Sequence, residues 1–158
     1  MSDDDIRAPH LRENDFLGVF AVVQRDDRIL MVQNERTIGG RTVRTWDLPG
    51  GQVEPGELLH EALLREVREE TALHVRGEPR FLFVQEGRRE AQRRRRYVWR
   101  SFFFACEADG VPMASSEVLG VAWFARTELA ATLTAPYHDS FRAWLEDGGG
   151  YHASTWCD

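Results

Sequence analysis

The chain has 158 residues, enough for one domain with its own hydrophobic core and too few for a second module of similar size. Hydrophobic residues make up 42% of it, which excludes an intrinsically disordered protein. The formal net charge of -6 argues against a general nucleic-acid binder, because a negative surface repels phosphate unless positive groups or metal ions are gathered locally.

Two further features bear on the compartment. Cys106 and Cys157 form neither a metal-binding spacing nor a framework of paired disulfides, which favours a reducing environment. The chain begins with an acidic segment where a secretory signal needs basic and then apolar residues, and no stretch is long enough to span a bilayer. We therefore expect a cytoplasmic protein without a membrane partner.

The first elements in chain order are two strands and a loop. Phe16–Gln24 and Arg28–Gln33 are apolar and rich in β-branched residues, which predicts a hairpin. Asn34–Thr45 carries Gly39-Gly40 and several arginines with little apolar content, so we expect a mobile loop there. Loops of this kind often contact substrate.

A helix and further mixed elements follow. Glu57–Thr71 consists of good helix formers with acidic residues at its start, where they complement the helix dipole. Later segments predict strands at Arg80–Gln85, Tyr97–Glu107 and Leu119–Ala125, and short helices at Thr127–Leu133, with Thr127 as N-cap, and Ser140–Leu145. Strands interleaved with helices predict the α/β class and a sandwich architecture.

The two ends of the chain differ from its middle. Residues 1–14 are charged and without periodicity, and we interpret them as a flexible arm. Gly148-Gly149-Gly150 begins a tail, residues 148–158, that we also expect to be flexible. A single domain at residues 15–147 lies between them.

Three glutamates stand out on the predicted helix. At about 100° per residue, Glu66, Glu69 and Glu70 fall within an arc of roughly 100°. Carboxylates roughly 6 Å apart repel by about 3 kcal/mol at an effective dielectric near 20, so a sheltered cluster needs a cation. Hard oxygen ligands suit Mg²⁺ or Mn²⁺. Taken alone, three glutamates in five residues are more often a solvated helix face than a metal site.

The wider pattern changes that balance. Gly51, five residues, Glu57, seven residues and then Arg65-Glu66-Val67-Arg68-Glu69-Glu70 closely resembles the Nudix box, whose form is G-x5-E-x7-R-E-U-x-E-E-x-G-U with U apolar. The second glycine of the box is Ala72 in this chain. That departure touches the turn after the helix and none of the carboxylates.

The resemblance implies a fold and a site. The fold is a Nudix-type α/β/α sandwich around a mixed β-sheet. The implied metal ligands are Glu66, Glu69 and Glu70 together with the backbone carbonyl of Gly50, with Mg²⁺ as the cofactor and Mn²⁺ possible.

The resemblance also suggests supporting roles. Glu57 pairs with Arg65 and, with Gly51, supports the box rather than binding metal. Two carboxylates are alternatives for the general base, Glu66 and Glu117, the second in the loop before the last strand; for Glu117 an ordinary surface role is equally plausible at this stage.

Candidate substrate contacts are Arg44, Trp46 and Arg88, although packing in the core is the stronger interpretation of Trp46. The run Arg93–Arg96 has the charge to steer phosphates or RNA, against the simpler interpretation of a solvated turn.

The implied activity is metal-dependent hydrolysis of a phosphoanhydride bond in a nucleoside diphosphate derivative. Nucleoside di- or triphosphates and nucleotide sugars are the favoured small-molecule substrates, because subfamily signatures for other substrates are absent downstream of the box. Alternatives are a nucleotide sensor without catalysis, which the intact glutamate set disfavours, and an RNA-binding or decapping hydrolase that uses Arg93–Arg96. A homodimer is a possible assembly.

Overall fold

The computed structural model describes residues 15–90 and 97–157, so the predicted arm at residues 1–14 and the run Arg93–Arg96 lie outside the described residues. Within these ranges, eight strands and three α-helices form. The strands are β1 (Phe16–Arg25), β2 (Arg28–Ile38), β3 (Arg41–Asp47), β4 (Gly50–Gln52), β5 (His74–Glu90), β6 (Tyr97–Asp109), β7 (Gly120–Ala125) and β8 (Tyr151–Cys157). The helices are α1 (Leu59–Thr71), α2 (Leu129–Thr132) and α3 (Asp139–Asp147), with short 3₁₀ turns at Arg126–Glu128 and Pro136–His138.

The strands form a mixed sheet in the order β3-β2-β1-β6-β5-β8, with β4 added to β1 and β7 added to β2. The pairs β1–β6 and β5–β8 are parallel, and the other pairs are antiparallel. Strand β1 pairs with β6 along most of its length, with β4 at Gly18–Phe20 and with β2 only at its end, so it joins the two halves of the sheet.

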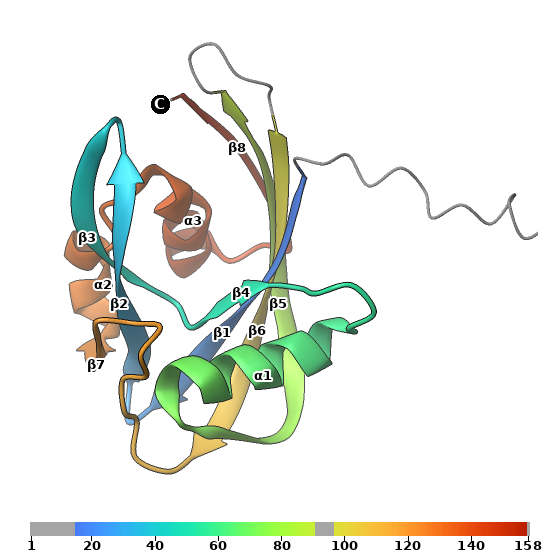
Figure 1. Cartoon of the computed structure of the whole chain (residues 1–158), viewed down its shortest axis with the longest axis vertical. Coiled ribbons are helices and arrows are strands. Elements are labelled where there is room, and N and C mark those ends of the chain that lie inside the picture. Colours follow the sequence, from blue (N-terminus) through green and yellow to red (C-terminus); the bar gives the residue numbers. More distant parts are fainter. Residues whose placement is uncertain (1–14, 91–96, 158) are drawn as a thin grey trace, which may run out of the picture.

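Helices cover both faces of this sheet (Figure 1). Helix α1 buries Leu63 and Val67 against β1 and β6, and this first core also contains Val19, Leu30 and Leu73. The opposite face packs on the segment from α2 to α3 through a second core of aliphatic and aromatic side chains that includes Phe83, Phe103, Leu129, Leu133 and Phe141. The predicted α/β/α sandwich around a mixed sheet is confirmed.

The prediction of a mobile loop at Asn34–Thr45 was wrong. Strand β2 continues to Ile38, the chain turns at Gly39-Gly40 with φ of 57° and 74°, and β3 returns in register with β2. Two consecutive positive φ values are the geometry of a tight hairpin turn. The alternation of apolar and polar residues that signals a strand is missing because most side chains around this turn are exposed.

The prediction of a flexible tail at residues 148–158 was also wrong for most of its length. After α3, Gly148 and Gly149 take positive φ values and redirect the chain, and β8 pairs in parallel with the end of β5. Backbone hydrogen bonds hold this strand to a sheet edge, and such bonds leave no mark in side-chain composition. Thr127 is likewise not an N-cap, because it lies inside the 3₁₀ turn that precedes α2.

Candidate metal and catalytic site

The packing of helix α1 against the sheet determines which way its glutamates point. Leu63 and Val67 are fully buried and fix the rotation of the helix against the sheet. The first turn is held by a hydrogen bond from the backbone N–H of Leu58 to the side-chain Oε2 of Glu61 at 2.9 Å. With that rotation, Glu66 is half-buried at the edge of the apolar stripe and Glu69 is exposed next to it.

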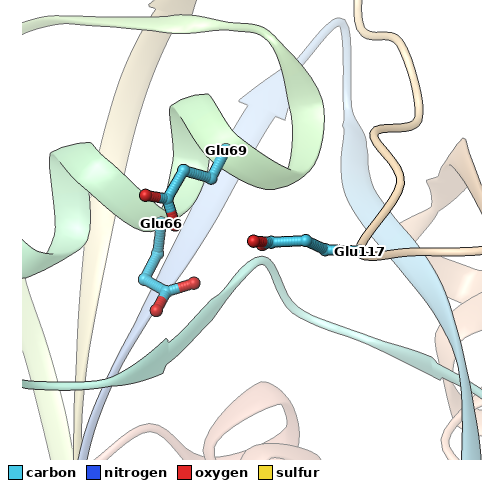
Figure 2. A group of neighbouring side chains, drawn as sticks. All are labelled: Glu66, Glu69 and Glu117. Carbon is cyan, nitrogen blue, oxygen red and sulfur yellow. The ribbon is translucent and has the colours of Figure 1, made fainter.

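Three carboxylates from two segments converge beside this helix. Oxygen atoms of Glu66, Glu69 and Glu117 all lie within 4.8 Å of one another. Figure 2 shows Glu117 reaching toward the two helix residues from the loop that precedes β7. The N–H of Glu117 donates to Ser115 Oγ at 3.1 Å and the N–H of Met113 donates to Thr71 O at 2.8 Å, so this loop is tied both to itself and to the end of α1.

Electrostatics within this cluster, Glu66, Glu69 and Glu117, favour a bound cation. Two charges 4.8 Å apart repel by roughly 3 kcal/mol at an effective dielectric near 20 and by less than about 1 kcal/mol in bulk water. Arg65 offsets part of this repulsion, since its Nη1 lies 3.0 Å from Glu66 Oε1 and 3.2 Å from Glu69 Oε2. One guanidinium cannot neutralise three carboxylates, so the cluster retains net negative charge.

Glu70 lies deeper than the other glutamates and is 8% exposed. Burial, and then the negative charge and hydrogen-bond contact of Glu66, raise the pKa of Glu70 to about 9 despite a hydrogen bond from the backbone N–H of Gly50. A carboxyl group in this position takes its charged form readily only when positive charge is brought to it. Glu70 is therefore a carboxyl group that a nearby cation would keep in its charged form.

The backbone of β4 passes close to these side chains because two glycines allow it. Gly50 has φ of 149°, and a Cβ there would lie 2.1 Å from Val19 O and 2.7 Å from Phe20 Cα. A Cβ on Gly51 would lie 2.8 Å from Glu66 Oε1, in the space that this carboxylate fills. The two glycines thus set where Glu66 and Glu70 meet the strand.

Arg65 and Glu57 form the ion pair that the sequence resemblance implies. Arg65 Nε donates to Glu57 Oε2 at 2.8 Å, and Arg65 Nη2 donates to Glu57 Oε1 at 2.8 Å. The hydrogen bond from Arg65, followed by one from the backbone N–H of Glu54, lowers the pKa of Glu57 to about 2. Arg65 Nη2 also donates to Gln52 O, so the pair links the helix to the end of β4.

The donor set fits a hard divalent cation. All the available ligand atoms are carboxylate or backbone oxygens, which Mg²⁺ and Mn²⁺ prefer. Glu66, Glu69 and Glu117 are close enough together to share an ion or a pair of ions. The carboxyl group of Glu70 is more deeply buried than these three and contacts Glu66.

The candidate substrate contacts lie apart from this cluster in the fold. Trp46 packs edge to face on Phe124, with ring centroids 5.0 Å apart, as part of the second core. Arg44 is exposed on β3 opposite Glu35, and Arg88 is exposed on β5. Within residues 15–90 and 97–157, no hydrogen bond or ion pair joins these three residues to the carboxylates.

A buried polar network escaped the sequence reasoning altogether. Asp47, 4% exposed at the end of β3, accepts hydrogen bonds from Tyr137 Oη and His138 Nε2 on Oδ1, both at 2.8 Å. Its Oδ2 accepts from Asn34 Nδ2, Thr45 Oγ1 and Arg36 Nη2.

The donors come from β2, β3 and the turn before α3, so Asp47 fastens the second half of the sheet to the C-terminal helices. The N–H of Ala135 donates to His138 Nδ1, so the ring proton of His138 is on Nε2, which donates the hydrogen bond to Asp47. No sequence signal joins Asp47 to His138, since 91 residues separate them.

Comparison with known proteins decides the family. The NUDIX domain model matches residues 15–145, which is most of the chain. The chain belongs to the Nudix hydrolase family. It is 37% identical over 136 residues to human 8-oxo-dGDP phosphatase NUDT18, which covers 82% of this chain and 38% of that protein. It is also 30% identical over 148 residues to a MutT-like protein of Streptomyces ambofaciens, covering 94% of this chain and 86% of that protein.

The fold agrees with this assignment. The structure of a MutT protein from Bacillus halodurans matches with a TM-score of 0.73 at 22% identity, covering 90% of each chain. This Nudix hydrolase spans well under half the length of human NUDT18, the first relative named above. Among the described residues, no helix has both the length and the apolar character that a membrane span requires.

Proposed function

We propose that this Nudix hydrolase is a divalent-metal-dependent enzyme that cleaves a phosphoanhydride bond in nucleoside di- or triphosphates. The observation that carries the proposal is the convergence of Glu66, Glu69 and Glu117, whose oxygen atoms lie within 4.8 Å of one another. A divalent cation at this position neutralises phosphate oxygens and makes a nearby water more acidic. Mg²⁺ is the expected ion, with Mn²⁺ as an alternative.

We assign two roles to the carboxylates, metal ligand and general base. Glu66 and Glu69 project from a rigid helix and hold the ion in place. Glu66 already accepts a hydrogen bond from Arg65 and contacts Glu70, which favours a ligand role over proton transfer. Glu117 approaches from a separate, exposed loop, so we assign it the general base that takes the proton of the attacking water.

The names of the relatives narrow the substrate. The human and mouse relatives are named 8-oxo-dGDP phosphatase, and a relative in Bacillus subtilis, 31% identical over 108 residues, is named a putative 8-oxo-dGTP diphosphatase. Purine nucleoside di- and triphosphates with an oxidised base are therefore the first substrates to try. Hydrolysis of the diphosphate breaks one P–O bond and gives the monophosphate and inorganic phosphate.

The test is a turnover assay on a panel of nucleotides with Mg²⁺, with Mn²⁺ and with chelator. The panel contains 8-oxo-dGDP, 8-oxo-dGTP, dGDP, CTP and a nucleotide sugar. We expect metal-dependent release of monophosphate that falls at least about a hundredfold in Glu117→Gln, since general base catalysis contributes a factor of about 10² to 10⁴. Glu146→Gln, which makes the same change on an exposed face of α3, is the control and retains wild-type turnover.

Two outcomes would refute the proposal. Turnover that persists in chelator would exclude the metal role, and wild-type turnover in Glu117→Gln would exclude that residue as the base. Nucleotide binding without any turnover across the panel would instead identify a sensor that keeps the Nudix fold.

A further inference from the structure

The loop that carries Glu117, residues 110–119, connects the two halves of the sheet, and we call it the Glu117 loop. It leaves the end of β6 and enters β7, which pairs with β2. Among the described strands, β6 and β7 form no backbone ladder with each other. Strand β1, the partner of β6, pairs with β2 only through Gln24 and Arg25. The position of Glu117 therefore depends on contacts that hold β6 and β7 together at this junction.

Few contacts hold the middle of the Glu117 loop. Within residues 110–119, Val118 is the one buried residue, and Met113 is 64% exposed. Two backbone hydrogen bonds of 2.8 Å reach other elements, from the N–H of Met113 to Thr71 O and from the N–H of Leu119 to Gln33 O. A loop with so little burial needs further contacts at its ends to keep a carboxylate at a fixed place.

Arg25, the last residue of β1, contacts the chain on both sides of the Glu117 loop. Its Nη1 donates to Gly110 O at 2.9 Å, and its Nη2 donates to Ala108 O. The same guanidinium lies over the ring of Trp123 on β7, with Cζ 5.0 Å from the ring centroid. A cation is attracted to the face of an indole, and hydrogen bonds from a charged donor are stronger than neutral ones. One side chain thus links the end of β6 to β7.

Local structure places this guanidinium. Asp26 and Asp27 take φ of 49° and 62°, the geometry of a tight two-residue hairpin turn, so the backbone on either side of the turn is fixed. The parallel ladder between β1 and β6 ends at Val23 and Cys106. Beyond that point the guanidinium of Arg25 takes the place of a strand, because it donates to two alternate carbonyls at and just beyond the end of β6.

We propose that Arg25 is a positioning residue that keeps Glu117 within reach of the carboxylates of α1. The inference rests on the proposed function, which assigns Glu117 as the general base. In the part of the chain that the structure describes, no hydrogen bond or ion pair joins Arg25 to α1, so its loss should move the base and leave Glu66 and Glu69 in place. A displacement of about 1 Å at a catalytic group costs up to about a hundredfold in rate.

The first test is a double-mutant cycle between Arg25 and Glu117, measured with saturating Mg²⁺ on the nucleotide of the panel that is hydrolysed fastest. Arg25→Met keeps the apolar stem and removes both hydrogen bonds and the charge. We expect kcat to fall at least about tenfold, with KM within about twofold of the wild-type value. In the Glu117→Gln background the same change should lower kcat by less than about twofold, because no base is left to position.

Arg28→Met is the matched control. Arg28 is exposed and pairs directly with Arg25 across the hairpin, so the variant makes the same chemical change beside the site and should keep the wild-type kcat. If Arg25→Met does not fold, Arg25→Lys takes its place in the cycle, because an ammonium keeps the charge but lacks the fixed fork that reaches two carbonyls.

A merely structural role predicts a different pattern. Loss of folded protein would lower kcat by the same factor with and without Glu117, and that result would overturn the inference, as would a wild-type kcat in Arg25→Met. Binding of Mg²⁺ measured by calorimetry should stay within about threefold of wild type in Arg25→Met. Binding as weak as that of Glu66→Gln would show that Arg25 supports the metal ligands instead, and the inference would fail.

Hydrogen exchange, which needs no turnover, separates this inference from the proposed function. We expect the hydrogen-bonded amides of Met113 and Leu119 to exchange at least about tenfold faster in Arg25→Met, with the amides of α1 unchanged. That result without any hydrolysis by the wild-type protein would remove the enzymatic proposal and leave Arg25 as the anchor of the loop. Unchanged exchange, combined with the expected loss of turnover in Glu117→Gln, would remove the role of Arg25 and leave the enzyme.

Discussion

Replacing Asp47 by Asn removes one charge from the buried network and changes almost no volume. The amide keeps Oδ1, which can still accept from Tyr137 and His138, but it places an NH₂ group where Oδ2 accepts three hydrogen bonds. Two of those come from neutral donors and one from Arg36. With a net value of about 1 kcal/mol for each neutral bond and somewhat more for the charged one, the loss is about 3 kcal/mol in the free energy of unfolding.

The assay for Asp47→Asn is urea unfolding at pH 7, followed by fluorescence of the tryptophans. Burial of Asp47 would raise its pKa, but the hydrogen bonds from His138 and Asn34 and the nearby charges lower that pKa well below its usual value. Because the folded-state pKa is lowered, the carboxylate stabilises the protein above the unfolded pKa of about 3.9, and this stabilisation is lost as the pH falls toward the folded-state pKa. The difference between wild type and variant should therefore shrink below about pH 4.

Two results would refute this reasoning about Asp47. One is a destabilisation under about 1 kcal/mol at pH 7, which would mean that the network contributes little. The other is a difference that stays constant from pH 7 to pH 3, which would mean that the charge of Asp47 is not responsible. Asp26→Asn makes the same change at an exposed turn residue between β1 and β2, and it serves as the control.

Three further changes test the site and its support. Ala72→Gly should raise the free energy of unfolding by about 1 kcal/mol in urea melts, because Ala72 has φ of 64°, a conformation that costs L residues about that much; a loss of stability would contradict this. Gly51→Ala should fold but push the carboxylate of Glu66 aside, so that at least about tenfold more Mg²⁺ is needed for half-maximal turnover, and an unchanged requirement would refute the close approach. Glu57→Gln weakens the ion pair of Arg65 with Glu57 and should strengthen the pairing of Arg65 with Glu66. Because Arg65 then competes with the cation for Glu66, the Mg²⁺ requirement should rise several-fold, and a lower requirement would show that the pair has another role.

Local patterns predicted the parts of the fold that depend on one segment. The rotation of α1 followed from the spacing of its apolar residues, and the tight spacing of Glu66 and Glu69 followed from helical geometry. The family resemblance suggested Glu117 as one possible base, and the structure brings its carboxylate to the helix. Residue spacing alone gave no reason to connect that loop to α1.

What the sequence did not reveal depends on contacts between distant segments. The strand character of Tyr151–Cys157 comes from backbone pairing with β5, which side-chain composition does not record. The link between Asp47 and His138 exists only once β3 and the turn before α3 are brought together.

The central claim is that the carboxylates of α1 hold a catalytic cation beside Glu117. Titration of Mg²⁺ and Mn²⁺ into the protein by calorimetry, with turnover measured on the same samples, tests this claim most directly. We expect saturable binding to the wild-type protein, at least about tenfold weaker binding to Glu66→Gln, and a parallel loss of turnover. Equal metal binding by wild type and Glu66→Gln, or full turnover by either protein in chelator, would contradict the assignment.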